Sequence, residues 1–238
     1  MPLIKGKRLN IGKFTIGNSL STVVTSIYDD DTHNLIEKLQ RKNLSDRNLY
    51  EMRYDLFGNA SLDNLYPFIS ALDEMDIDYI FTYRSNNPEK FYEDAITKMV
   101  PAVDIELGYI KKMPIRPVDT KIIVSYHGKD NKNIIEKIEE MASLDFDIVK
   151  AAAYYTDIES FLNDLVSVID FKKSSGIPIS FVPMGENSGF LRIISSYFVS
   201  DLVYAKYEKD TAPGQPEMSD YLDAFRLFSK LYRKIDTI

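Results

Sequence analysis

Two kinds of hydrophobic pattern alternate along the chain: short β-branched or aromatic runs, and longer stretches in which apolar residues recur every three or four positions. The first predicts buried strands and the second amphipathic helices, so their alternation favours a parallel α/β fold. The predicted strands are 22–28, 49–57, 78–84, 102–107, 121–127, 147–154, 177–184 and 202–207. The predicted helices are 31–42, 61–75, 88–99, 132–144, 157–173, 188–198 and 217–233.

Segment 107–121 breaks this alternation, because Pro114 and Pro117 interrupt it and predict a short or irregular connection. Eight strands in 238 residues fit a (β/α)8 TIM barrel, which typically has about 250 residues. A doubly wound sheet more often stops at about five or six strands. With no internal repeat or linker-like stretch, we predict one α/β domain, a (β/α)8 TIM barrel, over residues 1–238.

The first 18 residues contain two short alternating runs around residues 10–12. This pattern predicts an N-terminal β-hairpin over 1–18, which would close the floor of the barrel. The same segment lacks the apolar stretch of a signal peptide, and no window is long and uncharged enough for a transmembrane helix. We therefore expect a cytoplasmic protein that does not bind membranes.

The composition limits the chemistry. The 29 basic and 36 acidic residues give a net charge of −7, which argues against binding to nucleic acid or anionic lipid. The absence of cysteine excludes disulfides, thiolate nucleophiles and cysteine-bound metals, and two histidines, His33 and His127, disfavour a histidine-rich metal site. We expect no metal and no cofactor, and we interpret His33 as a surface residue at the start of a polar helix.

Charged residues lie on several strands that should be almost wholly apolar in a barrel. By the strand period of two, they share a face opposite the core residues. Buried charges cost several kcal/mol each unless they are paired, so the pattern predicts a paired network with a function. The residues are Glu51, Arg53, Asp55, Arg84, Asp104, Glu106, His127 and Lys150.

Structural and functional interpretations compete at each position. Asp55, Asp104 and Glu106 are interpreted as ion-paired scaffold residues. Lys150 has apolar neighbours on both sides, which disfavours a surface lysine. His127 ends a strong strand at the barrel face where active sites form, so we interpret it as a site residue.

Seven segments, in this order, resemble the type I 3-dehydroquinate dehydratase family over nearly the whole chain. They are Glu-Met-Arg-Tyr-Asp at 51–55, Phe-Thr-Tyr-Arg-Ser at 81–85, Val-Asp-Ile-Glu-Leu at 103–107, Ile-Val-Ser-Tyr-His at 123–127, Asp-Ile-Val-Lys at 147–150, Met184-Gly185 followed by Arg192, and Ala-Pro-Gly-Gln at 212–215. The resemblance implies metal-free elimination of water from 3-dehydroquinate, through a lysine Schiff base, to give 3-dehydroshikimate. It places the enzyme, a carbon–oxygen lyase, in the shikimate pathway of aromatic amino acid biosynthesis.

The resemblance also implies roles for single residues. Lys150 matches the Schiff-base lysine, and His127 matches the general base, which also donates a proton to the departing hydroxyl. Loop 208–217 matches a lid over the substrate, and a homodimer is a further implication. Substrate binding falls to Glu51, Arg53, Arg84, Arg192, Thr211 and Gln215, and Ser26, Met184 and Tyr204 line the pocket.

The chain departs from the family pattern at two positions. A glutamate expected four residues after Arg84 is replaced by Pro88, with Glu89 beside it, and Val182 stands where methionine is common. Two other interpretations stay open. A class I aldolase or transaldolase-like barrel would use 184–189 as a phosphate loop, although Glu186 would repel phosphate. A catalytically silent barrel would act as a binding module.

Overall fold

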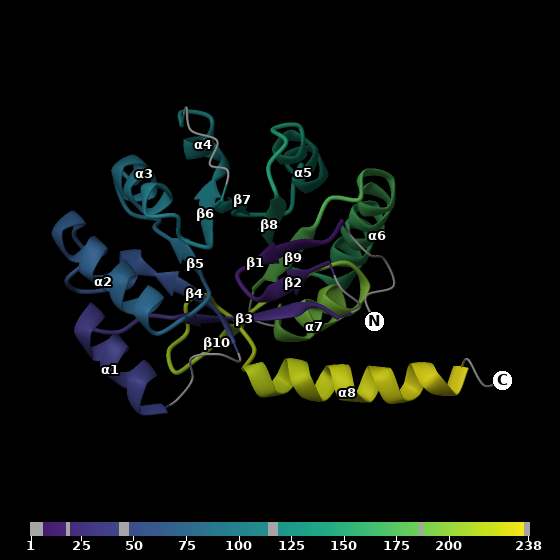
Figure 1. Ribbon diagram of the computed structural model, residues 1–238. Coiled ribbons are helices and arrows are strands. Elements are labelled where there is room, and N and C mark those ends of the chain that lie inside the picture. Colours follow the sequence, from purple (N-terminus) through teal and green to yellow (C-terminus); the bar gives the residue numbers. More distant parts are fainter. Residues whose placement is uncertain (1–6, 18–19, 43–47, 114–118, 186–187, 236–238) are drawn as a thin grey trace.

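The computed structural model describes residues 7–17, 20–42, 48–113, 119–185 and 188–235, and its eight parallel strands form a ring with helices on the outside (Figure 1). The ring strands are β3 (Thr22–Ile27), β4 (Leu49–Arg53), β5 (Tyr79–Thr82), β6 (Ala102–Glu106), β7 (Lys121–Gly128), β8 (Ile148–Tyr154), β9 (Ile179–Met184) and β10 (Leu202–Lys206). The described helices are α1 (Thr32–Lys42), α2 (Leu62–Glu74), α3 (Glu89–Thr97), α4 (Leu107–Ile110), α5 (Ile134–Ala142), α6 (Ile158–Ser175), α7 (Ser188–Phe198) and α8 (Met218–Ile235). The predicted (β/α)8 TIM barrel is confirmed.

The sheet runs in chain order from β3 to β9, and β10 pairs in parallel with β3, which leaves β9 and β10 as the two ends of the ladder. Single hydrogen bonds bridge this seam. The backbone N–H of Asp201 donates to the carbonyl of Ile179 at 2.6 Å, and the Ser180 hydroxyl donates to the carbonyl of Leu202 at 2.9 Å. The barrel is therefore nearly closed.

Alternate residues of each strand enter two separate apolar cores. Residues such as Met52, Phe81 and Val103 face outward and pack in the layer between the strands and the helices. Ile80, Ile123 and similar residues face inward and fill the N-terminal half of the barrel. The period of two then places charged side chains of the same inward face nearer the carboxyl ends of the strands, above an apolar floor.

A hairpin of β1 (Leu9–Ile11) and β2 (Phe14–Ile16) packs under this floor, as predicted. Ile11 and Ile16 are fully buried in the inner core. Gly12 turns the chain with φ +52°, and a Cβ there would lie 1.6 Å from the Asp78 carboxylate, so a larger residue would strain the backbone and displace that side chain. Residues 1–6 and 18 of the predicted hairpin lie outside the described residues.

One predicted strand is too long. The pattern places Asp55 on the inward face of strand 49–57, but β4 ends at Arg53 and a 3-10 turn, η1 (Tyr54–Leu56), follows. Tyr54 is fully buried among aromatic rings, including that of Phe68 at 5.6 Å between centroids, and this packing outweighs the strand pattern. The irregular connection 107–121 begins with the single turn α4, and its residues 114–118 lie outside the described residues.

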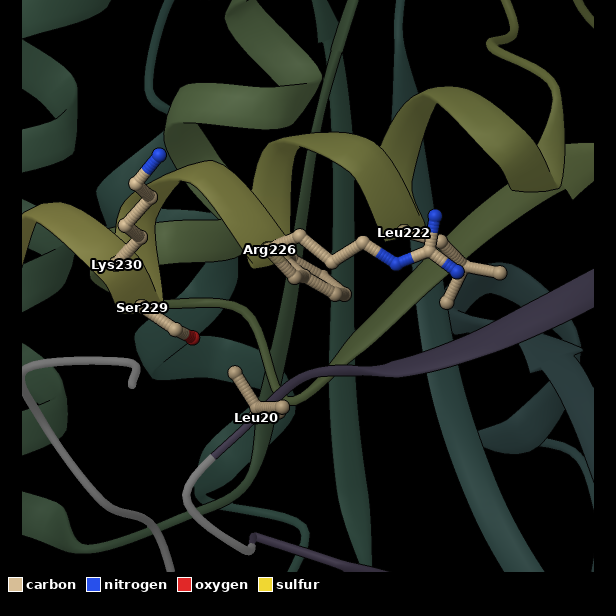
Figure 2. A pocket seen from close by; sticks show the side chains of 6 residues that line it. Leu20, Leu222, Arg226, Ser229 and Lys230 are labelled. Carbon is tan, nitrogen blue, oxygen red and sulfur yellow. The ribbon is translucent and has the colours of Figure 1, made fainter.

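Helix α8 runs along the lower edge of Figure 1 and, with Leu20, borders a groove of about 490 Å³ outside the barrel (Figure 2). The groove is lined by Leu20, Leu222, Phe225, Arg226, Ser229 and Lys230. None of the helices in the described parts of the chain is long and apolar enough to cross a membrane.

Candidate active site

A cavity of about 280 Å³ lies at the carboxyl ends of the strands. Every residue that the sequence predicted as catalytic, substrate-binding or pocket-lining contributes to its wall, although these residues come from distant parts of the chain. Ala152 follows Lys150 on the same strand face, and Val182, Ala212 and Pro213 complete the wall. The predicted residues are Ser26, Glu51, Arg53, Arg84, His127, Lys150, Met184, Arg192, Tyr204, Thr211 and Gln215.

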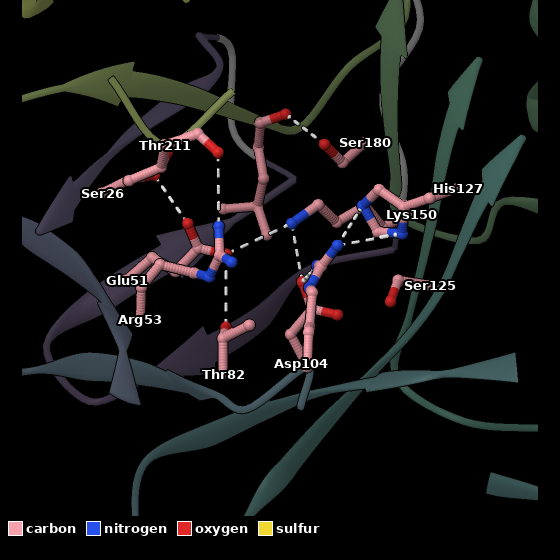
Figure 3. A network of polar contacts seen from close by, with 12 residues as sticks. Ser26, Glu51, Arg53, Thr82, Asp104, Ser125, His127, Lys150, Ser180 and Thr211 are labelled. Carbon is pink, nitrogen blue, oxygen red and sulfur yellow. Dashed lines mark hydrogen bonds and ion pairs between the residues drawn. The ribbon is translucent and has the colours of Figure 1, made fainter. Parts of the chain in front are cut away.

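Lys150 projects from the middle of β8 into a cluster of carboxylates (Figure 3). Its Nζ lies 2.6 Å from Asp104 Oδ2 and 3.4 Å from Glu51 Oε1. The ring of Tyr204 covers the ammonium, with Nζ 3.6 Å from the ring centroid. Lys150 is only 4% exposed, so it is a cavity residue and not a surface lysine.

Asp104 joins two cations. Its Oδ2 accepts from Lys150 and also from Arg84 Nη2 at 2.9 Å. Burial alone would raise the pKa of Asp104, but Lys150 and Arg84 outweigh it and the pKa is lowered. Asp104 is therefore an ion-paired carboxylate, as the sequence indicated, and it also contacts Lys150 directly.

Glu51 connects Lys150 to the loop that was predicted as a lid. Its Oε2 accepts from the Ser26 hydroxyl at 2.6 Å, and its Oε1 accepts from the Thr82 hydroxyl at 3.2 Å. Gln215 donates in turn to Ser26 at 3.1 Å. Burial raises the pKa of Glu51, but Lys150 and the two nearby arginines outweigh it, so the pKa is lowered and the side chain is a carboxylate.

His127, near the end of β7, lies between charges of opposite sign. Arg84 Nη1 contacts both ring nitrogens, and Glu106 Oε2 lies 2.8 Å from Nδ1. Burial and then Arg84 lower the pKa of His127 below its ordinary value, while Glu106 opposes them. The imidazole is therefore neutral at pH 7 and able to accept a proton. His33, in contrast, has a 79% exposed side chain that pairs with Glu37.

Two arginines hold the backbone of segment 208–217. Arg192 on α7 is 3% exposed, and it donates through Nε to the carbonyl of Pro183 at 3.0 Å and through Nη2 to that of Pro213 at 3.3 Å. Arg53 Nη1 donates to the carbonyl of Thr211 at 3.4 Å and binds the Asp55 carboxylate at 2.7 Å through Nη2. Asp55 thus reaches the site by pairing with Arg53 from the turn after β4.

The same segment packs closely on the start of α7. Gly214 has φ +68°, and a Cβ at this position would lie 2.2 Å from Ser188 Oγ and 2.7 Å from the carbonyl oxygen of Gly185. The Thr211 hydroxyl donates to Gln215 Oε1 at 2.7 Å, which folds the segment on itself. Thr211, Pro213 and Gln215 therefore form the roof of the cavity.

The first departure from the family pattern, Pro88 with Glu89 beside it, lies at the start of α3. Pro88 is the N-cap of α3 and Glu89 is its first residue, whereas the carboxylate bonded to His127 comes from Glu106 on β6. The sequence indicated that Glu106 is ion-paired but not that its partner is His127. Glu186, on which the argument against a phosphate loop depended, lies outside the described residues.

Comparisons with known proteins bear on the family and the fold of the chain. The family model for type I 3-dehydroquinase matches residues 23–232. A 3-dehydroquinate dehydratase of Thermoplasma volcanium is 54% identical over 229 residues, covering 96% of this chain and 99% of the relative. One of Thermoplasma acidophilum is 46% identical over 226 residues, covering 95% and 98%. The crystal structure of 3-dehydroquinate dehydratase from Geobacillus kaustophilus matches the fold with a TM-score of 0.83 at 18% identity, covering 95% of this chain and 98% of that one.

Proposed function

Because the chain belongs to the type I 3-dehydroquinase family, we propose that it converts 3-dehydroquinate to 3-dehydroshikimate and water through a Schiff base on Lys150. The observation that carries this proposal is the Lys150 amine, which is enclosed in the barrel and faces the cavity among paired carboxylates. Such an amine is the group that a ketone needs for imine formation. The reaction would belong to the shikimate pathway.

The proposed steps balance as follows. The unprotonated Lys150 amine adds to the substrate ketone, and uptake of one proton with loss of one water leaves a protonated imine. His127 removes a proton from the adjacent carbon, the C–H electron pair forms a carbon–carbon double bond, and the C=N π pair moves to the nitrogen. The resulting enamine expels the hydroxyl group, which His127 protonates to water. Hydrolysis of the protonated imine then consumes one water, returns the amine and the proton, and releases the product, so one water is lost overall.

The neighbouring groups suit these steps. A neutral imidazole can take the carbon-bound proton, which supports His127 as the base. Asp104 and Glu51 lie beside the amine and can stabilise its positive form during imine formation. Their charges are in turn balanced by Arg84 and, at Glu51, also by Arg53.

Recognition of the substrate is assigned to the wall and roof of the cavity. Arg192 carries a planar guanidinium suited to a carboxylate, and its burial makes that interaction stronger than it would be in water. Glu51, Arg53, Arg84, Thr211 and Gln215 would hold the hydroxyl groups of the ring. We propose that segment 208–217 acts as a lid that excludes water from the imine.

Borohydride trapping tests the proposal. Incubation with 3-dehydroquinate and sodium borohydride should reduce the imine to a stable secondary amine, and peptide mass mapping should place the adduct on Lys150. Lys150→Ala should form no adduct and should lose turnover while circular dichroism shows an intact fold. Unaltered turnover in this variant would exclude the Schiff-base mechanism.

The same experiment separates the alternatives. An aldolase-like barrel would trap a phosphorylated ketone in preference to 3-dehydroquinate, and inorganic phosphate would inhibit it. A silent barrel would trap neither compound although it is folded. Family membership over residues 23–232 favours the dehydratase over both.

A cytoplasmic location and a homodimer stay predictions. Exposed apolar side chains follow one face of α6 at Ile158, Leu162 and Val166, which is a surface that a second copy could bury. Light scattering coupled to size exclusion should then give twice the mass of one chain. The Leu162→Lys variant should instead have the mass of a single chain. A monomeric mass for the unaltered protein would contradict the homodimer.

A further inference from the structure

Glu106 holds His127 at two points. It is the last residue of β6, and the ladder pairs it with Ser125, two residues before His127 on β7. Its Oε1 accepts from the His127 backbone N–H at 3.1 Å, while its Oε2 lies 2.8 Å from Nδ1 of the ring. The Ser125 hydroxyl also donates to Oε2, at 3.4 Å. The same carboxylate therefore binds both the backbone and the ring of His127.

This contact determines where the ring proton lies. A carboxylate only accepts hydrogen bonds, so Nδ1 must carry the proton that bridges to Glu106. In the neutral ring, Nε2 is then the nitrogen with a lone pair. We propose that Glu106 is a positioning residue which orients His127 and keeps its proton on Nδ1, so that Nε2 takes the proton from the substrate; the proposal rests on the dehydratase function proposed above.

The other charged groups around His127 make a different contribution. Arg84, which follows β5, is a cation whose Nη1 contacts both ring nitrogens, and because a guanidinium only donates, its bond to Nε2 requires that this nitrogen carry no proton. Lys150 on β8 is a second cation farther away. Asp104 on β6 interacts with the ring through its charge, but its oxygen is bound to Lys150 and Arg84. Glu106 is thus the group that favours a proton on the ring through a direct bond.

Kinetics of Glu106→Gln test the proposal against a structural role. The amide cannot supply the negative charge, so kcat should fall about 10- to 100-fold, which is a part of the roughly 10² to 10⁴ that proton transfer as a whole supplies. KM should change little, because Glu106 does not line the cavity. Since Glu106 raises the pKa of His127, the acidic limb of kcat/KM should move to lower pH in the variant.

Glu89→Gln is the matched control, because Glu89 is the neighbouring carboxylate at the start of α3 and it does not line the cavity. It should retain the kcat and the pH profile of the unaltered protein. A normal kcat and acidic limb in Glu106→Gln would overturn the proposal. The same would follow if Glu89→Gln, and not Glu106→Gln, caused the loss.

Two further measurements keep the test decisive. Borohydride should still trap 3-dehydroquinate on Lys150 in Glu106→Gln, because imine formation precedes proton removal; failure of trapping in the unaltered protein would instead overturn the proposed function. If the variant does not fold, nitrogen-15 NMR of the unaltered protein gives the answer. The chain has only two histidines, so His33→Gln assigns the His127 signals. A proton on Nε2 of the neutral ring would contradict the proposal.

Discussion

Among single residues, Asp104 balances two cations, because its fully buried side chain forms ion pairs with both Lys150 and Arg84. Asp104→Asn removes that charge from the buried Lys150 and the partly buried Arg84, so the free energy of unfolding at pH 7 should fall by about 3–5 kcal/mol. Urea unfolding measures this. Asp223→Asn is the control, since its exposed pair with Arg226 should be worth less than about 1 kcal/mol. Equal losses in both variants would contradict the paired network.

The pH dependence of stability follows from the same residue. The pKa of Asp104 is lower in the folded state than its ordinary value of 3.8, so its contribution is fully present above that value and is lost as the pH falls through the folded one. The unaltered protein should therefore lose stability on acidification below about pH 4 more steeply than Asp104→Asn. Parallel curves from urea unfolding at successive pH values would contradict this assignment.

Hydrophobic periodicity predicted much at the residue level, because a charged residue on an apolar strand is conspicuous. Lys150 and His127 were found in this way, and the family motifs added the residues of the roof. The partner of Glu106 could not be predicted, because it depends on the register between β6 and β7, which no local pattern encodes. The bonds from Arg192 to the backbone of Pro213 depend likewise on tertiary packing.

At the level of elements, the roof segment depends on one glycine. Gly214→Ala places a methyl group against Ser188 and the Gly185 backbone, which should push Pro213 away from Arg192. A displacement of about 1 Å in a site can reduce activity on the order of 100-fold, so kcat/KM should fall between 10- and 100-fold. Steady-state kinetics with 3-dehydroquinate measure this loss.

Gly176→Ala provides the control for backbone strain. Gly176 ends α6 with the same φ of +68°, but an added Cβ there meets nothing within 4 Å. Both variants should lose about 1–2 kcal/mol of stability from the left-handed backbone, whereas only Gly214→Ala should lose activity. If both retain full activity, segment 208–217 does not act as a lid.

The boundaries of the elements show what the sequence leaves undetermined. The alternation of patterns is sufficient to predict the eight strands, because each buried strand is bounded by polar or helical sequence. It failed after Arg53, where the burial of Tyr54 among aromatic residues turns the chain out of the strand. Local periodicity does not show that this packing outweighs the strand pattern, since the rings that pack on Tyr54 come from other elements.

For the molecule as a whole, closure of the barrel depends on the seam between β9 and β10. Asp201, just before β10, accepts from the Ile179 N–H at 2.9 Å and pairs with Lys172 of α6 at 2.8 Å, with neither side chain exposed. Lys172 also donates to the carbonyl of Val199 at 2.6 Å. This pair therefore ties a helix and both edge strands together at the one place where the ladder is interrupted.

Lys172→Met should open this seam first. It leaves the Asp201 carboxylate buried without its cation, so the free energy of unfolding should fall by about 3–5 kcal/mol. Hydrogen exchange at the Ile179 amide should accelerate more than at amides of β5. Lys173→Met, at the next position, removes an exposed pair and should change stability by less than about 1 kcal/mol. Adding Asp201→Asn to Lys172→Met should recover part of the loss, because no unpaired charge then remains buried; an unchanged or larger loss would mean that the seam depends on packing and not on this ion pair.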